Sequence, residues 1–598
     1  MDKIAVLDFG GQYAHLIANR VRRLGVYSDI FDGEVSASEL KDGGYKGVIL
    51  SGGPQSVHEK DSLQADSGIF ELGVPVLGIC YGHQVISHML GGRVDRGEVR
   101  EYGLATVSIL NKGEVFEGLE NEEQAWMSHF DQVVEVPSGF EVSASTSDCP
   151  IAGMWDAERR IFSVQFHPEV THTPNGMKVL GNFVGICGAK KEWSIEKFIE
   201  QEVATIKDKV GDKKVFMLVS GGVDSTVAFT LLEKALGNDR VFGLFVDIGF
   251  MREGEVEQVT EALKGLGITN LRVEDAAAEY FEALKEVYEP EQKRGIIGKL
   301  FLDVQKRVFE EMSLDPAEWI LGQGTIYPDT IETGGTKHAD TIKTHHNRVP
   351  EIQALIDAGQ VIEPIAQLYK DEVRGVGEKL GLPHDMVWRH PFPGPGLAVR
   401  CLCSEEEVGD VEDLSELNSK ISSEGYDAIV LPVKSVGVQG DVRSYQHPVV
   451  LSGGEKNFEK LEAASIALTN SFAEVNRGLY LLSGDVEDLE LKKVYLTRER
   501  IAVLQKADKI VMDFLYEKGL EKAIWQFPTV LVPLGSAGGS GESIVLRPVE
   551  SEEAMTANFY KMDFELLEEL VGRLEKVEGV DAVFYDITNK PPATIEWE

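Results

Sequence analysis

The chain has 598 residues and a formal net charge of −40, from 99 acidic and 59 basic side chains. This length predicts about three or four domains, and a hydrophobic content of 43% supplies their cores. The charge repels polyanions unless a local basic patch intervenes, so we expect no nucleic-acid partner. No apolar run approaches about twenty residues and the first residues lack a signal-peptide pattern, so we expect no membrane span.

The cysteines are few and widely spaced, and their number, five, is odd, which argues against a disulfide framework. Two of them form the pair Cys401-x-Cys403. No second ligand pair lies near it in the sequence, so we interpret the pair as structural rather than as a zinc site. The others are Cys80, Cys149 and Cys187. A reducing cytoplasm is the expected compartment.

The N-terminal third alternates between two hydrophobic patterns. Residues 4–9, 48–51 and 77–80 are strand-like, and helical patterns separate them. Strand–helix alternation is typical of a mostly parallel sheet with helices on its faces. The alternation restarts at residues 215–219 and 241–247, beyond a polar boundary near residues 188–193. We therefore predict an α/β fold class, with a doubly wound parallel sheet in the second domain.

A candidate nucleophile lies where the buried strand 74–79 turns sharply into a helix. Cys80 stands between Gly78 and Gly82, which is the nucleophile-elbow pattern with sulfur in place of oxygen. The glycines relieve crowding in a strained turn, and the start of a helix lowers the pKa of a thiol. The alternative is a buried cysteine that packs as a small hydrophobe.

A candidate base follows the strand 161–166, which we expect to end at His167 because Pro168 blocks further pairing. His167 and Glu169 are two residues apart, so in an extended chain they share a face. The imidazole can then take the thiol proton while the carboxylate fixes its tautomer. A lone loop histidine is more often solvated, so this prediction depends on the cysteine elbow.

A second reactive centre begins where the apolar strand 215–219 enters a glycine-rich loop. Two glycines let the backbone approach a phosphate, and a following helix presents its positive end. The Walker lysine is absent from the sequence. The alternative is an ordinary turn. The predicted ATP-binding residues of the loop are Ser220, Gly221, Gly222, Val223, Asp224 and Ser225.

Three further segments accompany this loop. Residues 320–347 are polar and glycine-rich and include Lys343-Thr344-His345-His346-Asn347, which we expect to close over triphosphate, with Lys343 stabilising the departing pyrophosphate. The adjacent histidines would diverge, which disfavours a metal site. Residues 293–299 form a basic cluster ahead of a predicted amphipathic helix. Residues 389–396 are stiff and proline-rich, suited to a fixed pocket wall or a linker.

Residues 1 to about 190 resemble the class I glutamine amidotransferases. The resemblance implies a catalytic triad of Cys80, His167 and Glu169. Ser51-Gly52-Gly53-Pro54 matches the oxyanion loop of that family, in which the amides of Gly53 and Tyr81 would hold the oxyanion. The positions that hold glutamine in the family are matched by Gln84, Ser128, His129 and Asp131, although residues 128–131 alone would suggest only a polar turn.

The loop 220–225 resembles the pyrophosphate loop of the N-type ATP pyrophosphatases, which split ATP between the α- and β-phosphates. The tail from Tyr585 to Glu598, and the order of all these motifs, resemble the glutamine-hydrolysing GMP synthetases. That resemblance implies Mg²⁺ bound with ATP, held by Asp224 directly or through water. It implies contacts to xanthosine monophosphate (XMP) from Arg294, Asp441, Gln526, Lys590 and Glu596.

The C-terminal region contains a weak internal repeat. Residues 428–433 recur at 529–534, 449–451 at 544–546, and 476–482 at 581–587, with offsets of 101, 95 and 105 residues. Two segments of this kind can also share such a pattern by chance. The resembling bacterial synthetases carry one copy and pair it with a second subunit. Because this chain carries two copies, we expect a monomer, with a homodimer as the alternative. The predicted domains are 1–190 (amidotransferase), 191–403 (ATP pyrophosphatase), 404–495 (first copy, an insertion typical of the longer eukaryotic-type form) and 496–598 (second copy).

The resemblance implies GMP synthesis from XMP, ATP and glutamine, with ammonia released at Cys80. Two rivals remain. A glutamine-dependent NAD or asparagine synthetase would share the pyrophosphatase loop, but the order of domains and the tail after Lys590 argue against both. A regulatory binding protein with catalytically inactive domains would not need the intact Cys80, His167 and Glu169 triad or the intact loop 220–225.

Overall fold

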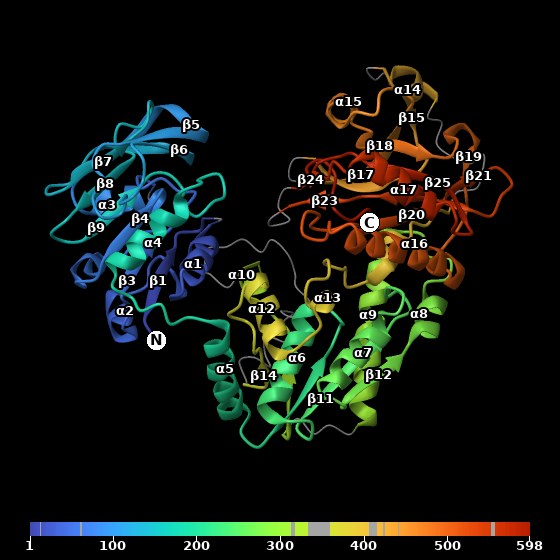
Figure 1. The fold of residues 1–598 in the computed structure, drawn as a ribbon, viewed down its shortest axis with the longest axis horizontal. Coiled ribbons are helices and arrows are strands. Elements are labelled where there is room, and N and C mark those ends of the chain that lie inside the picture. The colour runs from blue at the N-terminus through green and yellow to red at the C-terminus, as the bar shows by residue number, and fades with distance from the viewer. Residues whose placement is uncertain are drawn as a thin grey trace. The chain divides into compact units, whose positions relative to one another are not determined.

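The computed structural model describes residues 1–11, 13–59, 62–312, 317–332, 359–405, 415–421, 425–439, 442–551 and 557–598. These residues form two compact units, which we describe separately: unit 1 is Met1–Lys209 with Gly324–Lys379, and unit 2 is Val210–Gln323 with Leu380–Glu598. Both units mix helices with sheets that contain parallel strands, so the predicted α/β class is confirmed (Figure 1). Within the described ranges, none of the helices is long and apolar enough to cross a membrane.

Unit 1 is built on a nine-stranded sheet with the order β2-β1-β3-β4-β9-β8-β7-β5-β6. The first five strands in this order are parallel and the rest pair antiparallel. The strands are β1 (Lys3–Asp8), β2 (Tyr27–Asp32), β3 (Gly47–Leu50), β4 (Val76–Ile79), β5 (Arg93–Ile109), β6 (Glu122–Glu135), β7 (Glu141–Ser145), β8 (Gly153–Asp156) and β9 (Ile161–Val164).

The parallel strands of unit 1 are buried on both faces. In β1, Ile4 and Val6 belong to one hydrophobic cluster, and Ala5 and Leu7 belong to another. This is the pattern of a central parallel strand that is covered by helices on both sides. The predicted strands 4–9, 48–51 and 77–80 each lie one residue later than β1, β3 and β4. The helices of unit 1 are α1 (Ala14–Arg23), α2 (Ala37–Gly43), α3 (Tyr81–Met89), α4 (Gly176–Ile186), α5 (Ile195–Val210), α10 (Tyr327–Glu332) and α12 (Lys370–Leu380), with the short strand β14 (Val361–Ile362).

Unit 2 contains a parallel sheet in which four strands lie in the order β12-β11-β10-β13. The basic cluster at residues 293–299 lies inside helix α9, so the prediction that it precedes a helix is wrong; Pro290 at the first turn starts the helix earlier. The strands are β10 (Lys214–Leu218), β11 (Val241–Asp247), β12 (Leu271–Asp275) and β13 (Trp319–Gly322). The helices are α6 (Val223–Leu236), α7 (Glu255–Gly265), α8 (Ala277–Ala283), α9 (Pro290–Glu311) and α13 (His384–Val387).

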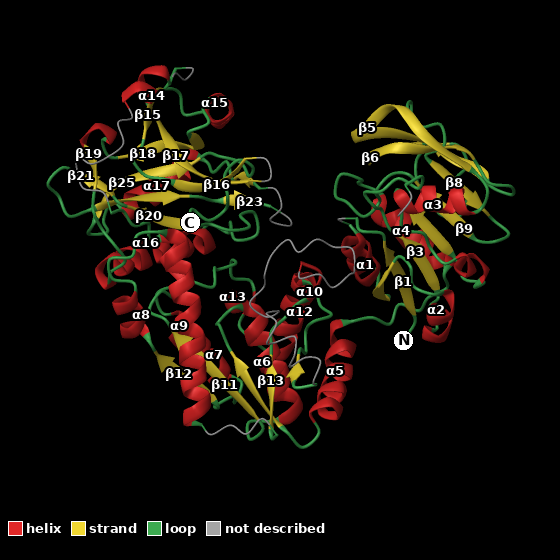
Figure 2. Cartoon of the chain, turned by 180° about the vertical axis from the view of Figure 1, so that it is seen from behind, coloured by secondary structure: helices red, strands yellow, loops and turns green. Residues whose placement is uncertain are grey.

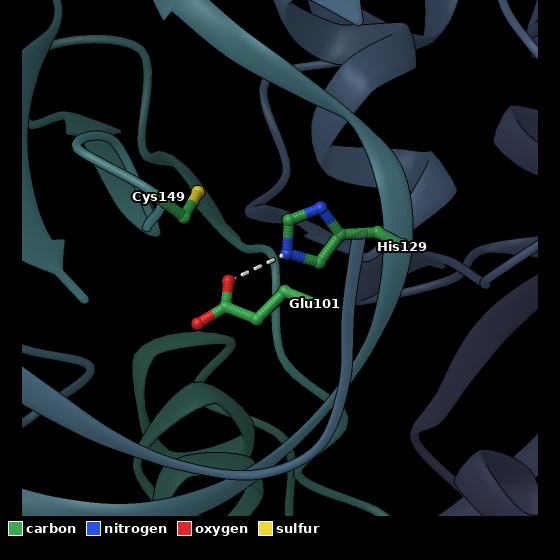
Figure 3. A group of neighbouring side chains, drawn as sticks. All are labelled: Glu101, His129 and Cys149. Atoms are coloured by element: carbon green, nitrogen blue, oxygen red, sulfur yellow. Dashed lines mark hydrogen bonds and ion pairs between the residues drawn. The ribbon is translucent and has the colours of Figure 1, made fainter. Parts of the chain in front are cut away.

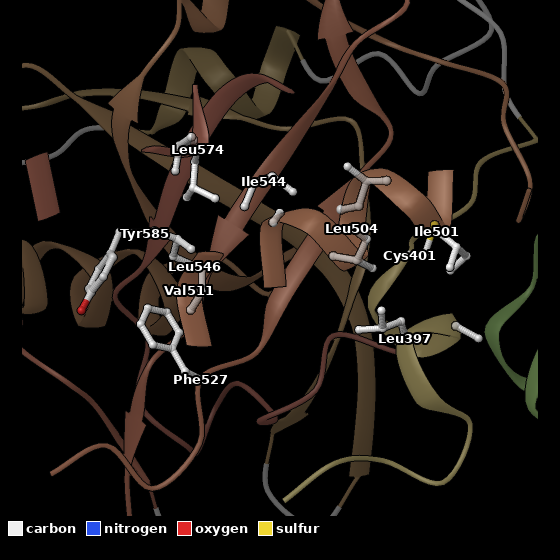
Figure 4. Packing of buried hydrophobic residues seen from close by; sticks show 14 of the residues in the cluster. Leu397, Cys401, Ile501, Leu504, Val511, Phe527, Ile544, Leu546, Leu574 and Tyr585 are labelled. Atoms are coloured by element: carbon white, nitrogen blue, oxygen red, sulfur yellow. The ribbon is translucent and has the colours of Figure 1, made fainter. Parts of the chain in front are cut away.

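The C-terminal part of unit 2 forms a larger sheet with the order β15-β17-β18-β25-β22-β20, and β16 pairs with β17 at its side (Figure 2). The core beneath it joins residues from distant parts of the chain, including Leu397, Leu504, Leu546 and Tyr585 (Figure 4). Its elements are α14 (Ser415–Lys420), β15 (Asp427–Val430), β16 (Ser435–Gln439), β17 (Val442–Ser452), α15 (Phe458–Ser471), β18 (Val475–Ser483), β19 (Leu489–Leu491), α16 (Arg498–Glu517), β20 (Thr529–Val532), β21 (Leu534–Ser536), β22 (Glu542–Leu546), β23 (Val549–Glu550), β24 (Asn558–Phe559), α17 (Phe564–Leu574) and β25 (Val580–Asp586).

The strand pairing of this sheet follows the internal repeat residue by residue. Ala428 pairs with Leu451 in the first copy, and the equivalent residues Thr529 and Leu546 pair in the second. The parallel pairs agree in the same way, since Val449↔Gly478 corresponds to Ile544↔Val583. The two copies meet where β18 pairs antiparallel with β25, and there Tyr480 pairs with its own equivalent, Tyr585. The sheet is therefore pseudo-twofold symmetric about the Tyr480–Tyr585 pair.

Candidate active sites

The candidate nucleophile occupies a strained turn between β4 and α3. Cys80 has a φ of 52° and a ψ of −103°, in the left-handed half of backbone space that side chains other than glycine rarely adopt. Neighbouring glycines make room for the turn: a Cβ on Gly78 would lie 2.6 Å from the carbonyl oxygen of Gly82, and a Cβ on Gly82 would clash with the backbone of Leu50. The Gly-x-Cys-x-Gly spacing thus allows a bend that places the buried thiol at the start of a helix.

The candidate base lies on the loop that follows β9. This strand ends at Val164, three residues before the predicted end at His167. His167 Nδ1 lies 2.7 Å from Glu169 Oε1, and both side chains are buried. Burial alone would lower the pKa of His167, but the charges of Glu169 and Cys80 and hydrogen bonds to both hold it well above its usual value. This environment stabilises the imidazolium that forms when the thiol gives up its proton.

The thiol has two further polar neighbours. Cys80 Sγ donates to the backbone oxygen of Ser128 at 3.6 Å, and Gln165 Nε2 donates to Sγ at 3.7 Å. No local sequence motif selected Gln165. On the other side, a Cβ on Gly52 would lie 3.1 Å from His167 Cε1 and 3.7 Å from Cys80 Cβ. The predicted oxyanion loop therefore passes directly beside the nucleophile and the base.

The predicted oxyanion donors and glutamine ligands gather around the same turn. A Cβ on Gly53 would lie 3.2 Å from Tyr81 Cδ1, so these two residues are neighbours. Gln84 Nε2 donates to the backbone oxygen of Asp131 at 2.7 Å, and His129 Nδ1 lies 3.1 Å from the same oxygen. Residues 128–131 belong to strand β6, so the alternative that they form a polar turn is wrong.

The predicted phosphate loop joins β10 to α6 in unit 2. Gly221 has a φ of 76°, and a Cβ there would lie 2.9 Å from Phe245 Cε2. The hydroxyls of Ser220 and Ser225 lie 3.0 Å apart, and Ser220 Oγ accepts from the amide of Gly222 at 3.3 Å. Val223 is the first residue of α6, and Asp224 lies in its first turn. Hydroxyls and a helix N-terminus thus face one small loop, an arrangement that suits an anion.

Arg389 adds a cation beside this loop. Its Nη1 lies 2.8 Å from Glu255 Oε1, and its side chain is 11% exposed. Burial lowers the pKa of Arg389, against the opposing influence of the charges of Glu255 and Asp224. The segment that it begins is held in place, since Gly396 has a φ of 63° and the amide of Leu397 donates to the oxygen of Phe250 at 2.7 Å. Residues 389–396 are therefore held in place by their neighbours, and a role as a pocket wall stays a prediction.

The C-terminal tail brings together several residues that are far apart in the sequence. Gln526 Nε2 donates to Glu596 Oε1 at 3.0 Å. The fully buried Arg400 binds both oxygens of Glu596, at 2.9 and 2.7 Å. Burial would raise the pKa of Glu596, but the positive charge of Arg400 lowers it below its ordinary value. No local sequence pattern pointed to Arg400.

The remaining predicted nucleotide contacts are only partly described. Arg294 Nη2 donates to the backbone oxygen of Glu598, and its charge also acts on Glu596. Lys590 exchanges backbone hydrogen bonds with Ala557, which fixes its place in the tail. Asp441 and Lys343 lie outside the described residues. The structure thus gathers Arg294, Gln526 and Glu596 at one place.

Three family models match successive parts of the chain: Glutamine amidotransferase class-I over residues 5–186, NAD synthase over residues 193–300, and GMP synthase C terminal domain over residues 513–597. The chain is thus a class I glutamine amidotransferase joined to an ATP pyrophosphatase and a GMP synthase C-terminal domain.

Full-length relatives agree with these matches. A protein of Leptospira interrogans (serovar Lai, strain 56601), described as a probable glutamine-hydrolyzing GMP synthase, is 47% identical over 603 residues, which cover 100% of this chain and 99% of that protein. The glutamine-hydrolyzing GMP synthase of Aquifex aeolicus (strain VF5) is 40% identical over 605 residues, with 100% of this chain and 99% of that protein covered. The chain therefore belongs to the family of glutamine-hydrolysing GMP synthases, as the sequence motifs predicted.

The Glu169–His167 pair yields a testable prediction. In the variant Glu169→Gln, the imidazolium loses the carboxylate charge that holds the pKa of His167 high, so this pKa should fall. Glutamine hydrolysis should slow by on the order of 10²- to 10⁴-fold. The pKa is measured by NMR titration of His167, and the rate by glutamate release. The control Glu135→Gln, whose side chain is 72% exposed on the same unit, should change neither. An unchanged His167 titration in a folded variant would contradict the assignment.

Proposed function

We propose that this chain makes GMP from XMP, ATP and glutamine, with Cys80 releasing ammonia and the loop 220–225 of unit 2 binding the phosphates of ATP. One observation carries the proposal: both reactive centres, the strained thiol and the hydroxyl-lined phosphate loop, occur within a chain whose full length matches glutamine-hydrolyzing GMP synthases. The match to NAD synthase covers only residues 193–300. The match to the GMP synthase C terminal domain favours a GMP synthase over an NAD synthetase.

In the first half-reaction, Cys80 Sγ attacks the side-chain amide carbon of glutamine. His167 accepts the thiol proton and returns it to the leaving ammonia, and water then hydrolyses the thioester to glutamate. The amides of Gly53 and Tyr81 would donate to the tetrahedral oxyanion, and each such donor contributes on the order of 3 kcal/mol. Gln84, Ser128, His129 and Asp131 would bind the glutamine itself.

In the second half-reaction, the 2-oxygen of XMP attacks the α-phosphorus of ATP and pyrophosphate leaves. The amides and hydroxyls of the loop 220–225 would bind the phosphates, and Arg389, beside Asp224, would offset their charge. Lys343 would stabilise the departing pyrophosphate. Ammonia then displaces AMP from the adenylated base and yields GMP.

Asp224 and the neighbouring hydroxyls are oxygen donors, the ligand chemistry that Mg²⁺ prefers, so they fit a magnesium ion that enters with ATP. When bound, this ion would neutralise charge on the phosphates. Asp224 would hold it directly or through water. The helix N-terminus of α6 acts on the same phosphates without a metal.

The tail supplies the proposed XMP site. Arg294 and Lys590 would bind the 5′-phosphate, while Gln526 and the ionised Glu596 would bind the base and ribose by hydrogen bonds. Asp441 would complete the site from the first repeat copy. Strand β16 of that copy supports this, because Val438 N donates to Pro592 O at 2.7 Å and Val436 N donates to Trp597 O at 2.9 Å. In the sequence, Asp441 follows the last residue of β16, Gln439, by two positions.

The sheet pairing supports a monomer. Strand β25 of the second copy pairs on one side with β22 and on the other with β18 of the first copy. A strand that is paired on both sides offers no edge to a second subunit. The first copy thus takes the place that a partner subunit would fill.

The cysteines are all free, as a reducing cytoplasm would leave them.

The proposed function yields three predictions, of which the first concerns the ammonia source. Cys80→Ala should abolish GMP formation from glutamine but leave synthesis from added ammonia, because the thiol serves only to release ammonia. The two rates are measured with XMP, ATP and Mg²⁺ present. Cys187→Ser, at a buried cysteine of the same unit, is the matched control and should keep both rates. Loss of the ammonia-driven rate in a folded Cys80→Ala variant would refute the separation of the two half-reactions.

The second prediction concerns the bond broken in ATP. The products should be AMP and pyrophosphate, and Asp224→Asn should lower the rate with either nitrogen source because the loop loses its carboxylate. Chromatography of the nucleotides gives the products directly. Glu233→Gln, a buried carboxylate on the same helix, is the control. Stoichiometric ADP would reject the assignment of the loop.

The third prediction concerns the oligomeric state. The protein should sediment as a monomer and keep its full specific activity when it is diluted to nanomolar concentration, because the first copy replaces the partner. Analytical ultracentrifugation and an assay over a dilution series test this together. An obligate dimer that loses activity on dilution would exclude the proposal.

A further inference from the structure

Three side chains with metal-binding atoms converge in unit 1, outside the catalytic triad (Figure 3). Glu101 lies on β5, His129 on β6, and Cys149 on the connection between β7 and β8. One ligand atom from each lies within 4.8 Å of the others. The chain brings them together from three separate elements, so their proximity is a product of the fold and not of a local sequence motif.

His129 is oriented as metal-binding histidines are. Its Nδ1 lies 3.1 Å from the backbone oxygen of Asp131, which can only accept, so Nδ1 carries a proton. The other nitrogen, Nε2, lies 3.0 Å from Glu101 Oε2. A histidine that binds a metal through one nitrogen usually donates the other N–H to a carbonyl or carboxylate, which fixes the ring. Asp131 provides that carbonyl.

The other two ligands, Glu101 and Cys149, are also positioned by hydrogen bonds from a neighbouring residue. Glu101 Oε1 accepts from Thr146 Oγ1 at 2.8 Å. The same hydroxyl accepts from the backbone amide of Cys149 at 2.9 Å. One threonine therefore positions both the carboxylate and the cysteine. Outer partners of this kind are a regular feature of metal sites, because they set the direction of the ligand atoms.

The cluster is buried and holds exchangeable protons. Cys149 is fully buried, and the side chains of His129 and Glu101 are 4% and 10% exposed. The contact between His129 Nε2 and Glu101 needs a proton on one of the two groups. A divalent cation that displaces the thiol proton of Cys149 and the proton shared by His129 and Glu101 leaves the buried charge nearly balanced.

We propose that Glu101, His129 and Cys149 bind one thiophilic divalent cation of the zinc class, and that the bound ion slows glutamine hydrolysis at Cys80. One sulfur, one nitrogen and one oxygen ligand suit Zn²⁺ and disfavour Mg²⁺ or Ca²⁺. A tetrahedral zinc ion needs ligand atoms roughly 3.3 to 3.8 Å apart. His129 Nε2 and Glu101 Oε2, at 3.0 Å, already lie close to this spacing, so a small adjustment of the ligands admits the ion, and the fourth position would take water.

Inhibition follows from what His129 and its strand contact. The Asp131 oxygen that holds His129 also accepts from Gln84 Nε2, a proposed glutamine ligand. The residue before His129, Ser128, accepts from the Cys80 thiol through its backbone oxygen. When His129 moves toward a metal ion, β6 moves with it, and both contacts of the glutaminase site change. Unit 2 should be unaffected, because the ion touches only unit 1.

Binding is tested with Co²⁺ on the full-length chain carrying Cys80→Ala, which removes the other thiol near a histidine. After removal of metals with a chelator, this variant should bind one Co²⁺ and show thiolate-to-cobalt charge-transfer absorption. Adding Cys149→Ser should abolish that absorption, whereas adding Cys187→Ser, at a second buried cysteine of unit 1, should keep it. Absence of stoichiometric binding in Cys80→Ala, or absorption that survives Cys149→Ser, would overturn the site.

Inhibition is tested with Cys80 intact, at free Zn²⁺ concentrations set by a metal buffer. Zn²⁺ should lower glutamate release and leave the ammonia-driven rate unchanged. Cys149→Ser should need at least about tenfold more free Zn²⁺ for the same fractional inhibition, each variant being compared with its own metal-free rate. Equal sensitivity of Cys149→Ser and the unaltered chain would show that Zn²⁺ acts elsewhere, for instance at Cys80, and would overturn the proposed link.

Discussion

The carboxylate of Asp586 is the constraint on which the C-terminal region depends. Its two oxygens pair with Arg477 at 2.9 Å and with Arg547 at 2.8 Å, and all three side chains are fully buried. Removal of one partner from such a cluster leaves an uncompensated buried charge, at a cost of about 3–5 kcal/mol. The three residues come from both copies of the repeat, so this cluster joins the copies more specifically than their strand pairing does.

The two arginines also fix the tail that follows β25. Arg477 Nη2 donates to the backbone oxygens of Thr594 and Glu596, at 3.0 and 3.1 Å, and Arg547 Nε donates to that of Thr594 at 3.0 Å. The tail is thus held by side chains at its backbone, which leaves the carboxylates of Glu596 and Glu598 to reach Arg400 and Lys293. The pseudo-symmetry does not extend to this cluster, because the residue of the first copy that is equivalent to Asp586 is Leu481, which carries no charge. The copies share a scaffold, and only one end of it carries the ionic tail anchor.

The sequence predicted features that depend on short spacings and missed those that depend on packing. The bend at Cys80, the two-residue step from His167 to Glu169 and the turn at Gly221 each involve backbone constraints over a few residues, so a motif can reveal them. Arg400 binds Glu596 across 196 positions, and nothing local to either residue selects the other. Lys293 belongs to the basic cluster 293–299, and nothing in that cluster indicated that its side chain is fully buried against Glu598. The repeat was predicted only in part. Its offsets are visible in the sequence, but the pairing of Tyr480 with Tyr585 is visible only in the folded sheet.

The surroundings of Cys80 and of Glu596 therefore differ in what maintains them. Around Cys80, the geometry is set by glycines and by backbone contacts close in sequence, so the turn needs little from the rest of the chain beyond the strands beside it. Around Glu596, the geometry is set by ion pairs that join α9, the segment after residue 389 and the tail. Buried ion pairs stabilise little by themselves, because desolvation offsets their attraction, but they penalise every arrangement that leaves a charge unpaired. In unit 2 these ion pairs thus select one arrangement of the tail. Any charged ligand that enters must fit the same set of pairs.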